Sequence, residues 1–576
     1  MGYGIASASS GTLTIGLSAI FARFIIFLGG LIFVVGAVII SFIVFLMMNQ
    51  RKKDFGLIKA AGCPNGLVFS YFLVELLILA FVGCLIGVIF GFLADFALAG
   101  FGGFQVSQEF PNIWLGLLVF IIYFLLAIAF GTKPLRDAAR LSPIEAMSPI
   151  KYFGLIKTDV FKPVSKFAFT IRISLRSLYR QQSAVIRVVF FLSLVFVLLT
   201  VAFAGSMIAN DTTKAWLEEA VDMNTIVIGR GDMCNQYQHL LSKFSGTAAN
   251  ESFEYLDQDL RIQEADLQKL NSTVGIAGLD PRLVWKGEIK EIAGFTIDPD
   301  TRATIPVGDD REGNSLIVGI EPEKVFDRGF LNGRFLTPDD ELRAVVGDSL
   351  AQELFSKPFS QSLKIEEYAF GIVGIRVDPI NNGRVVYILA NSLRNITGLD
   401  GFNIVLARMG DGVNREARLK AIEERIKGID SELTVLDLKE TMQTNLKYLS
   451  SLWSSVIIVS IFSLIPAAFC LAGYLLLSIE EQHKEFGILR AVGVKPKTVM
   501  AILSIQSLVI LISSWAVGTS LGIIVTLLIL VPQPTVTIST VLITAAGIVA
   551  VLLVMFTMSL YAAIRFAEKP ILESIG

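Results

Sequence analysis

Charged residues are scarce in this sequence. Only 17% of the 576 residues are charged, against about a quarter in soluble proteins, whereas 53% are hydrophobic. The net charge of −2 argues against a nucleic-acid-binding protein, which would need a basic surface. The composition is that of a membrane protein.

Motifs for catalysis, nucleotide binding and metal binding are also missing. There is no G-x-x-x-x-G-K-[ST] loop to hold nucleotide phosphates, no H-E-x-x-H pair and no Ser-His-Asp set. The sequence has two histidines, His239 and His483, and four cysteines that fall in separate segments and form no disulfide framework. We therefore expect no catalytic site, no metal and no cofactor in this chain.

One short motif is present twice. Lys53–Gly62 reads K-D-F-G-L-I-K-A-A-G, and Lys484–Gly493 reads K-E-F-G-I-L-R-A-V-G. The match continues without a gap into the apolar run after each motif, where Gly87 falls on Gly518. A repeated charged loop followed by a repeated apolar run indicates two copies of one membrane module.

Seven apolar runs are long enough to cross about 30 Å of hydrocarbon. The expected spans are Phe24–Met48, Val68–Leu98, Trp114–Phe130, Val188–Ile208, Leu452–Leu477, Val499–Val531 and Val536–Ala563. A polar stretch between the fourth and fifth spans, Ala209–Lys447, has the composition of a soluble domain, and we call it the outer domain. The expected fold is a polytopic α-helical membrane protein with one α+β extracytoplasmic domain.

Basic residues gather between the third and fourth spans and in both repeated loops. Lys and Arg are enriched on the cytoplasmic side of membranes, so all three segments are expected inside the cell. This places the N-terminus outside, the C-terminus in the cytoplasm and the outer domain outside the cell membrane. Phe167–Arg187 is expected to form an amphipathic helix along the inner membrane surface, with Arg172, Arg176 and Arg180 on its basic face.

Both modules have the same order of elements and the same orientation, which makes the repeat parallel. Each contains a long helix, the charged loop, a second long helix, a turn, a third helix and a cytoplasmic tail. The predicted domains are 1–147 for the first three-span module, 148–187 for a cytoplasmic linker with the basic helix, 188–208 for the fourth span, 209–447 for the outer domain and 448–576 for the second three-span module.

Short alternating patterns in the outer domain predict strands, and helical periodicity predicts helices. The predicted strands are Ser315–Ile320, Ala344–Gly347, Ala369–Ile375, Arg384–Leu389 and Asn403–Leu406, and the predicted helices are Asp348–Ser356 and Gly412–Ile429. We expect two lobes, with helices at Thr212–Glu218 and Asp437–Leu449 that continue the neighbouring spans. N-x-S/T sequons make four asparagines candidates for N-glycosylation, with chance occurrence an equal alternative: Asn210, Asn250, Asn271 and Asn395.

A face of small residues is repeated in the second and sixth spans. Its members are Gly83, Gly87 and Gly91 in the first copy and Ser514, Gly518 and Gly522 in the second. Small residues at this spacing allow helices to approach closely, so helix packing is the expected role, with lining of a substrate path the less favoured alternative. The intramembrane acid Glu75 aligns with the uncharged Gln506, so we expect it to form an interhelical hydrogen bond and not a proton relay.

These features together resemble the FtsX/MacB-type permease family of ABC transporters. The two loops are similar to the family signature R-x-x-E-[IF]-G-[IL]-x-[RK]-A-x-G-A, with Asp54 and Glu485 as the acid. The outer domain is similar to the MacB periplasmic core domain through Val318-Gly319-Ile320 and Ala344-Val345-Val346-Gly347, among other segments. Members with two modules usually have eight spans and two outer domains, so this sequence departs from the pattern by one span and one outer domain.

The resemblance implies a permease subunit that is not itself an enzyme. ATP and Mg would be bound by separate ABC ATPase subunits, which would dock on the two loops, with apolar residues such as Phe55, Leu57 and Ile488 filling a groove on the partner. A plain turn at the membrane surface is the alternative for such loops. The implied coupling residues are Lys53, Asp54, Phe55, Gly56, Lys59 and Gly62 in the first loop and Lys484, Glu485, Phe486, Gly487, Arg490 and Gly493 in the second.

The implied function is to couple ATP hydrolysis to movement of the outer domain, which would export or extract a lipid, lipoprotein, peptide or drug. One alternative is an FtsX-like transmembrane regulator of an extracellular cell-wall hydrolase. An ion-coupled secondary transporter is disfavoured, because intramembrane charge is scarce. Further expected partners are membrane lipids and a second permease or extracytoplasmic subunit, and no nucleic acid is expected.

Overall fold

The computed structural model describes residues 17–101, 113–140, 166–180, 182–246, 252–297, 302–326, 329, 331–410, 414–491, 493–531 and 533–567. The chain folds as two compact units. The first, which contains the outer domain, comprises Met1–Phe24, Ala209–Trp453 and Val531–Thr535, and the second, which we call the helical unit, comprises Ile25–Ile208, Ser454–Leu530 and Val536–Gly576.

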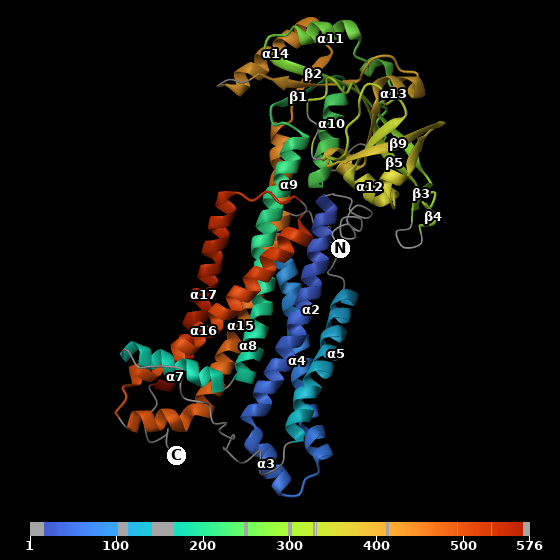
Figure 1. Cartoon of the computed structure of the whole chain (residues 1–576). Coiled ribbons are helices and arrows are strands. Elements are labelled where there is room, and N and C mark those ends of the chain that lie inside the picture. Colours follow the sequence, from blue (N-terminus) through green and yellow to red (C-terminus); the bar gives the residue numbers. More distant parts are fainter. Residues whose placement is uncertain are drawn as a thin grey trace. The chain divides into compact units, whose positions relative to one another are not determined.

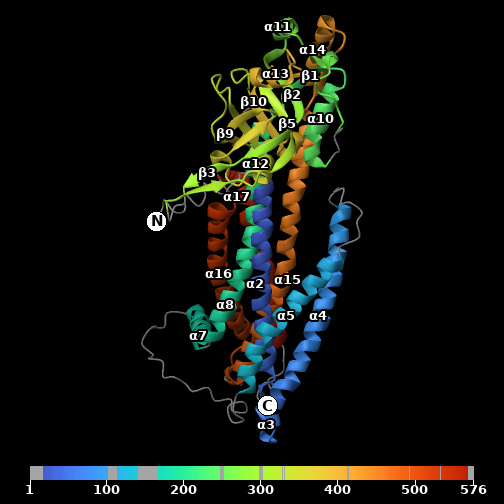
Figure 2. The same cartoon turned by 90° about the vertical axis from the view of Figure 1, so that its right-hand side faces the viewer.

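The helical unit is built from long apolar helices, because in a bilayer a helix satisfies its backbone groups internally. Both repeated loops lie at the same end of this unit, where α3 and the last turns of α15 are found (Figures 1 and 2), as a parallel repeat requires. Its elements are α2 (Leu17–Gln50), α3 (Lys52–Ala60), α4 (Asn65–Phe101), α5 (Ile113–Ala139), α7 (Lys166–Arg180), α8 (Gln182–Thr200), η1 (Val201–Gly205), α15 (Lys439–Ala491), α16 (Pro496–Val525), η6 (Thr526–Leu530) and α17 (Ile538–Ala567), of which α2 and α15 begin in the other unit.

Six of the seven expected spans are found as apolar helices long enough to cross a membrane among the described residues. They are Ile20–Met48, Asn65–Leu93, Ile113–Asp137, Val185–Ala220, Pro496–Leu530 and Ile538–Leu560. The remaining expected span, Leu452–Leu477, lies within α15, where the shorter apolar stretch Ala467–Leu476 is found. This span stays a prediction.

The amphipathic helix expected at Phe167–Arg187 is present as α7, which ends at Arg180 before α8 begins. One face of α7 is buried through Ser174, Ser177 and Leu178, whereas Leu175 and Tyr179 are exposed. Exposed apolar side chains beside arginines suit the boundary between lipid headgroups and hydrocarbon.

The outer domain is built on one ten-stranded mixed sheet in the order β12-β1-β11-β2-β5-β10-β7-β9-β6, with β8 paired to β2 and β9. The pairs β5–β10 and β7–β9 are parallel. The strands are β1 (Thr225–Arg230), β2 (Ile276–Ile292), β5 (Glu312–Ile320), β6 (Leu331–Gly333), β7 (Arg343–Gly347), β8 (Ser362–Ile365), β9 (Tyr368–Arg376), β10 (Val385–Leu389), β11 (Ile404–Met409) and β12 (Leu433–Asp437), and a separate hairpin consists of β3 (Gly294–Ile297) and β4 (Thr304–Val307).

The helices of this domain connect and flank the strands. They are α9 (Ser206–Ala220), α10 (Met233–Ser242), α11 (Glu264–Asn271), α12 (Asp348–Leu354), α13 (Ala390–Thr397) and α14 (Arg415–Ile429). All five predicted strands are present as β5, β7, β9, β10 and β11, and both predicted helices as α12 and α14. The helices expected to continue the neighbouring spans are also present, as α9 and as the start of α15.

The expectation of two lobes is wrong. Strand β2 is 17 residues long and pairs with β11, β5 and β8, so it joins both halves of the sheet. One hydrophobic core serves the whole sheet, from Ile226 and Leu433 at one end to Phe370 and Ile375 at the other. The domain is therefore a single packed body.

Asp340 shows how polar groups hold the segment between β6 and β7. Its carboxylate accepts hydrogen bonds from Arg334 Nη2 at 2.7 Å and from the backbone amide of Thr337 at 2.8 Å. Arg334 and Thr337 together hold the pKa of this carboxyl well below its ordinary value. Because the folded state favours the carboxylate, its stabilising effect is complete at neutral pH and is lost as the pH falls below about 4.

Replacing this carboxylate should therefore have a pH-dependent effect. We expect Asp340→Asn to lower the free energy of unfolding at pH 7 by about 1–3 kcal/mol, because charged hydrogen bonds are lost. The difference from wild type should shrink as the pH falls below about 4. Thermal melts of the detergent-solubilised full chain between pH 3 and pH 7 measure this, with Asp339→Asn as the exposed neighbouring control. A destabilisation that does not change with pH would contradict the assignment.

Candidate functional site

The first repeated loop is the nine-residue helix α3 followed by a glycine turn. Asp54 lies in its first turn and Lys59 in its last, which matches the direction of the helix dipole. The amide of Cys63 donates to the carbonyl of Ile58 at 3.3 Å, and that of Gly62 donates to Lys59 at 2.9 Å. This is the Schellman pattern of helix ends, and Gly62 has the left-handed φ of +91° that it requires.

The second loop ends with the same backbone conformation. Gly493 has a φ of +99°, and α16 begins three residues later at Pro496, where a proline costs the helix no hydrogen bond. Here α15 continues as a helix to Ala491, whereas in the first copy α2 ends at Gln50 and α3 is separate. The side chains of Lys53, Lys484, Glu485, Phe486 and Arg490 lie outside the described part of the chain.

Each loop is fixed to the helical unit by an equivalent apolar cluster. In the first copy the cluster includes Met48, Val68 and Phe72. In the second, Ile479, Val499 and Leu503 pack together, and these are the residues that fall on the same three positions of the repeat. The duplication seen in the sequence is thus also a duplication of packing.

The expectation that Phe55 fills a groove on a partner needs correction. Phe55 is completely buried, and its ring stacks on that of Phe72 with centroids 4.2 Å apart. The next but one residue, Leu57, is 61% exposed, and its repeat counterpart Ile488 is 64% exposed. Phe55 therefore attaches the loop to its own helices, and Leu57 and Ile488 are the apolar residues left for a partner.

Glu75 forms the interhelical contact expected of it, as an ion pair. Its Oε2 lies 2.8 Å from Nη1 of Arg51, the residue between α2 and α3. The counterparts in the second copy are Gln482 and Gln506, so both partners are charged in one copy and both are neutral amides in the other. The first loop is thus linked to α4 by charge.

The small residues behave differently in the two copies. Gly518 and Gly522 lie directly against α8, and Ser514 is buried on the same face. By contrast, a Cβ added to Gly83, Gly87 or Gly91 would meet nothing within 4 Å. The expected helix packing is therefore seen within the described residues for α16 and not for α4.

A buried ionic network lies in the outer domain and was not anticipated. Arg282 Nη2 donates to Asp280 at 2.6 Å, and Arg376 Nε lies 3.1 Å from Asp378 Oδ2, with all four side chains buried. Arg376 Nη2 also donates to the carbonyl of Ala220, the last residue of α9, at 3.3 Å. Buried charges must be paired, so this network fixes the end of α9 to the sheet.

The start of α15 is fixed to the outer domain in a similar way. Asp437 accepts hydrogen bonds from Arg415 at 2.6 and 2.9 Å and from the amide of Lys439, the first residue of α15, at 3.0 Å. Burial acts to raise the pKa of Asp437, but these hydrogen bonds outweigh it and hold the pKa below its ordinary value. The charged form of Asp437 is therefore the form that the fold selects.

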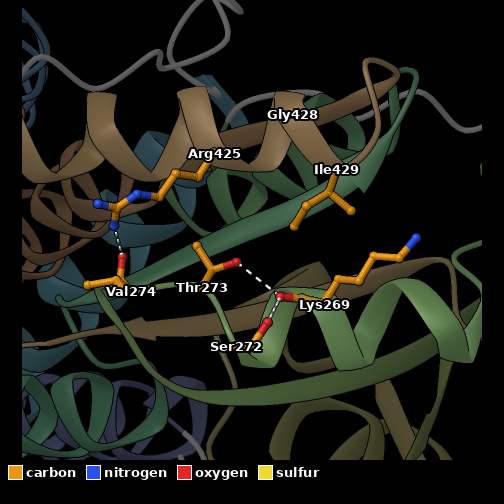
Figure 3. A pocket seen from close by; sticks show the side chains of 7 residues that line it. All are labelled: Lys269, Ser272, Thr273, Val274, Arg425, Gly428 and Ile429. Atoms are coloured by element: carbon orange, nitrogen blue, oxygen red, sulfur yellow. Dashed lines mark hydrogen bonds between the residues drawn. The ribbon is translucent and has the colours of Figure 1, made fainter.

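An open cavity of about 480 Å³ lies between α11 and α14. Its polar groups bond mainly to one another: Arg425 donates to the carbonyl of Val274, and Ser272 and Thr273 donate to that of Lys269 (Figure 3). Lys269 Nζ is 3.3 Å from Asp266. We assign no ligand to this cavity. Nor do the described residues contain a group of three or more His, Cys, Asp or Glu placed to hold a metal ion.

The sequons lie in different environments. Asn271 is exposed at the C-terminal end of α11, and Asn395 is exposed within α13. Asn210 is half-buried in α9. Asn250 lies outside the described residues. Glycosylation at these positions stays a prediction.

Two family models match the chain. The FtsX-like permease C-terminal model matches residues 26–143 and again 457–571, and the MacB-like periplasmic core domain model matches residues 192–425. Together they cover well over half of the sequence. The chain belongs to the FtsX/MacB-type permease family. It is thus a multi-pass membrane permease with two FtsX-like modules around one extracytoplasmic domain, which confirms the resemblance found in the motifs.

Curated relatives of this permease match over short stretches. The macrolide export ATP-binding/permease protein MacB of Vibrio parahaemolyticus is 32% identical over 116 residues, or 20% of this chain and 17% of that protein. The ABC transporter permease YknZ of Bacillus subtilis is 26% identical over 131 residues (23% and 32%), and MJ1507 of Methanocaldococcus jannaschii is 25% identical over 199 residues (33% and 50%). The chain thus spans no more than half the length of these three relatives.

Two solved structures are similar to part of this chain. The periplasmic region of MacB from Actinobacillus actinomycetemcomitans has 17% identity and a TM-score of 0.28, covering 39% of this chain and 94% of that one. The extracellular domain of the transporter YknZ from Gram-positive bacteria has 15% identity and a TM-score of 0.25, covering 37% and 100%.

Phe55 is buried and Leu57 is exposed, so mutation of the two residues should change stability by very different amounts. We expect Phe55→Ala to destabilise the helical unit by about 3–5 kcal/mol, because it leaves a cavity beside Phe72. Leu57→Ala should have little effect on stability, because the side chain is exposed. Thermal inactivation of the detergent-solubilised permease, followed by size-exclusion chromatography, measures both. Equal losses of stability in the two variants would show that Phe55 is not the buried residue and Leu57 the exposed one.

Proposed function

We propose that this permease couples ATP hydrolysis on separate nucleotide-binding subunits to movement of its outer domain. The observation that supports this most directly is the repeated loop, which occurs twice at one end of the helical unit with the same glycine turn. Two equivalent loops suit a pair of equivalent partners, as two ATPase subunits would be.

The exposed side of each loop could dock on a partner through one apolar side chain, Leu57 in the first loop and Ile488 in the second, and we call these two residues the knobs. Leu57 and Ile488 present one apolar side chain at the same position of each copy, and basic residues flank them in the sequence. Burying such a residue in a partner's groove would gain about 1.5–3 kcal/mol, and basic residues on the rim would favour an acidic partner surface. The buried apolar cluster beneath each loop keeps the knob in place.

The outer domain is attached where the helices leave it. The end of α9 is fixed by Arg376, and the start of α15 by Asp437 and Arg415. Residues 182–220 run through α8, the π-helical segment η1 and α9, and α15 is one helix of 53 residues that ends in the second loop. Helices that continue from the spans can pass a displacement of the loops to the sheet.

We also propose a location for each part of the chain. By the distribution of basic residues, both loops, the linker and the C-terminus are cytoplasmic, and the N-terminus and the outer domain are outside. ATP and Mg are bound by the partner ATPase. We propose an export or extraction role at the outer face for a lipid, lipoprotein, peptide or drug, which matches a permease whose largest polar domain is outside.

Charge placed on the two knobs tests the coupling role. In Leu57→Asp and Ile488→Asp, a carboxylate would have to be buried in the partner's apolar groove, which costs several kcal/mol. We expect each variant to reduce the nucleotide-binding subunit recovered with the purified permease, and the double variant to abolish its recovery. Quantitative mass spectrometry of the purified complex measures this.

The conservative variants Leu57→Met and Ile488→Leu should retain the ATPase subunit, since they keep an apolar side chain of similar size. Size-exclusion profiles must show that all variants remain folded. If the double aspartate variant retains the ATPase subunit, or if none accompanies the wild-type permease, the coupling proposal fails.

A further inference from the structure

One row of residues on α16 is buried along its whole length. It consists of every fourth residue, so each member lies close to the next on the helix surface, and the row winds around the helix by about 40° per step. They are Ile502, Gln506, Ile510, Ser514, Gly518 and Gly522. The row includes a glutamine, a serine and two glycines, which is a composition typical of a helix–helix contact and not of a lipid-facing surface.

Two preceding helices cover this row. At its start, Ser174 of α7 donates a hydrogen bond to the carbonyl of Ile502 at 3.0 Å. Further along, a Cβ on Gly518 would lie 2.5 Å from the carbonyl oxygen of Ser193 in α8, and one on Gly522 would lie 2.7 Å from Cβ of Thr200. The two backbones therefore approach so closely that only glycine fits at these positions.

The same row on α4 is open except at Glu75, whose carboxylate pairs with Arg51. Tyr71 is 66% exposed, whereas its counterpart Ile502 is 1% exposed. Leu79 is 54% exposed, whereas its counterpart Ile510 is 1% exposed. Below them, a Cβ on any of the three glycines of the row, Gly83, Gly87 and Gly91, would meet nothing within 4 Å. The repeat register thus aligns a covered surface of α16 with an uncovered surface of α4.

The adjacent side of α4 is packed as in the second copy. Helix α5 contacts it where a Cβ on Gly131 would lie 2.7 Å from Leu76 and one on Gly116 would lie 2.5 Å from Phe92. Helix α4 therefore packs against α5 and is exposed over most of its remaining surface, of which the open row is the part whose counterpart on α16 is buried. Each glycine costs a helix about 1 kcal/mol relative to alanine, and contact with lipid returns none of this.

We propose that the open row of α4 binds a transmembrane helix of a separate membrane subunit, with the contact pattern of α8. The second module shows what such a helix must provide. It needs a small residue and a β-branched residue seven positions apart, as Ser193 and Thr200 are in α8, and a short basic amphipathic helix before it that reaches Tyr71, as α7 reaches Ile502. This inference does not depend on the coupling role of the loops.

A second copy of this chain does not meet these requirements. Its own α8 is already packed against its own α16, at Gly518 and Gly522. Two α4 helices could pair through their glycines, but that pairing would leave the Tyr71 end of the row without an equivalent of α7. A helix supplied by another polypeptide satisfies both ends.

Photo-crosslinking in native membranes tests the source of the helix. A benzophenone amino acid is placed at Gly87 in the full chain, with Ile89 as the matched control, because Ile89 is at a similar depth, is exposed and lies on the opposite face. We expect a product from position 87 that maps, by mass spectrometry of its peptides, to a span preceded by a basic amphipathic segment in another polypeptide. Position 89 should give at least about tenfold less, the factor that about 1.4 kcal/mol of preferential association provides.

Three results would overturn the proposal. They are crosslinks only to lipid, crosslinks to a second copy of this chain, and crosslinks to a span of the same polypeptide. Equal products from positions 87 and 89 would count against it as well, because they would show that the row has no preferred contact.

A second measurement examines the chemistry of the surface with a defined probe. The full chain, with Cys63, Cys84, Cys234 and Cys470 replaced by alanine and carrying Gly87→Cys, is combined in vesicles with a separate polypeptide of residues 160–222 that carries Phe196→Cys. Phe196 is chosen because its Cβ lies 2.5 Å from the position of a Cβ on Gly518. We expect disulfide formation at Gly87→Cys to be about tenfold faster than at Ile89→Cys. Equal rates, with the probe shown to be inserted, would refute an α8-type contact.

Discussion

Close contact between helix backbones is the interaction on which the membrane part of this protein depends. Lipid tails are as apolar as the helices, so no hydrophobic force drives the helices together, and association requires surfaces that fit. Gly518 and Gly522 provide that fit by allowing α8 to lie directly on α16. Helix α7 packs at the start of the same row, where Ser174 donates a hydrogen bond to the carbonyl of Ile502.

Much of the fold could be predicted, because membranes and buried strands impose simple patterns. Long apolar runs predicted six of the membrane-spanning helices, and the short alternating pattern of Ala369–Ile375 predicted β9. Strand β2 could not be found in this way, since it contains Asp280 and Arg282, and charged residues are normally read as solvent-facing. These two residues are buried because they neutralise each other, which only the folded structure reveals.

The candidate site was predictable in its backbone and not in its side chains. Glycine after a short helix predicts a left-handed turn, and both Gly62 and Gly493 adopt it. The sequence could not show which apolar residues of α3 face inward, because Phe55 and Leu57 are equally hydrophobic. Tertiary contact with Phe72 decides the matter. The ion pair of Arg51 and Glu75 was likewise visible only as two separate charges.

The order of strands in the outer domain has a consequence for biosynthesis. Strand β1 follows the fourth span directly, yet it pairs with β11 and β12, which are made about 180 to 210 residues later. At roughly 5–20 residues per second, β1 therefore waits on the order of ten seconds or more for its neighbours. During that interval both edges of β1 are unpaired. The nascent domain is therefore most exposed to aggregation and proteolysis after β1 has crossed the membrane and before β12, which ends at Asp437, has crossed it as well.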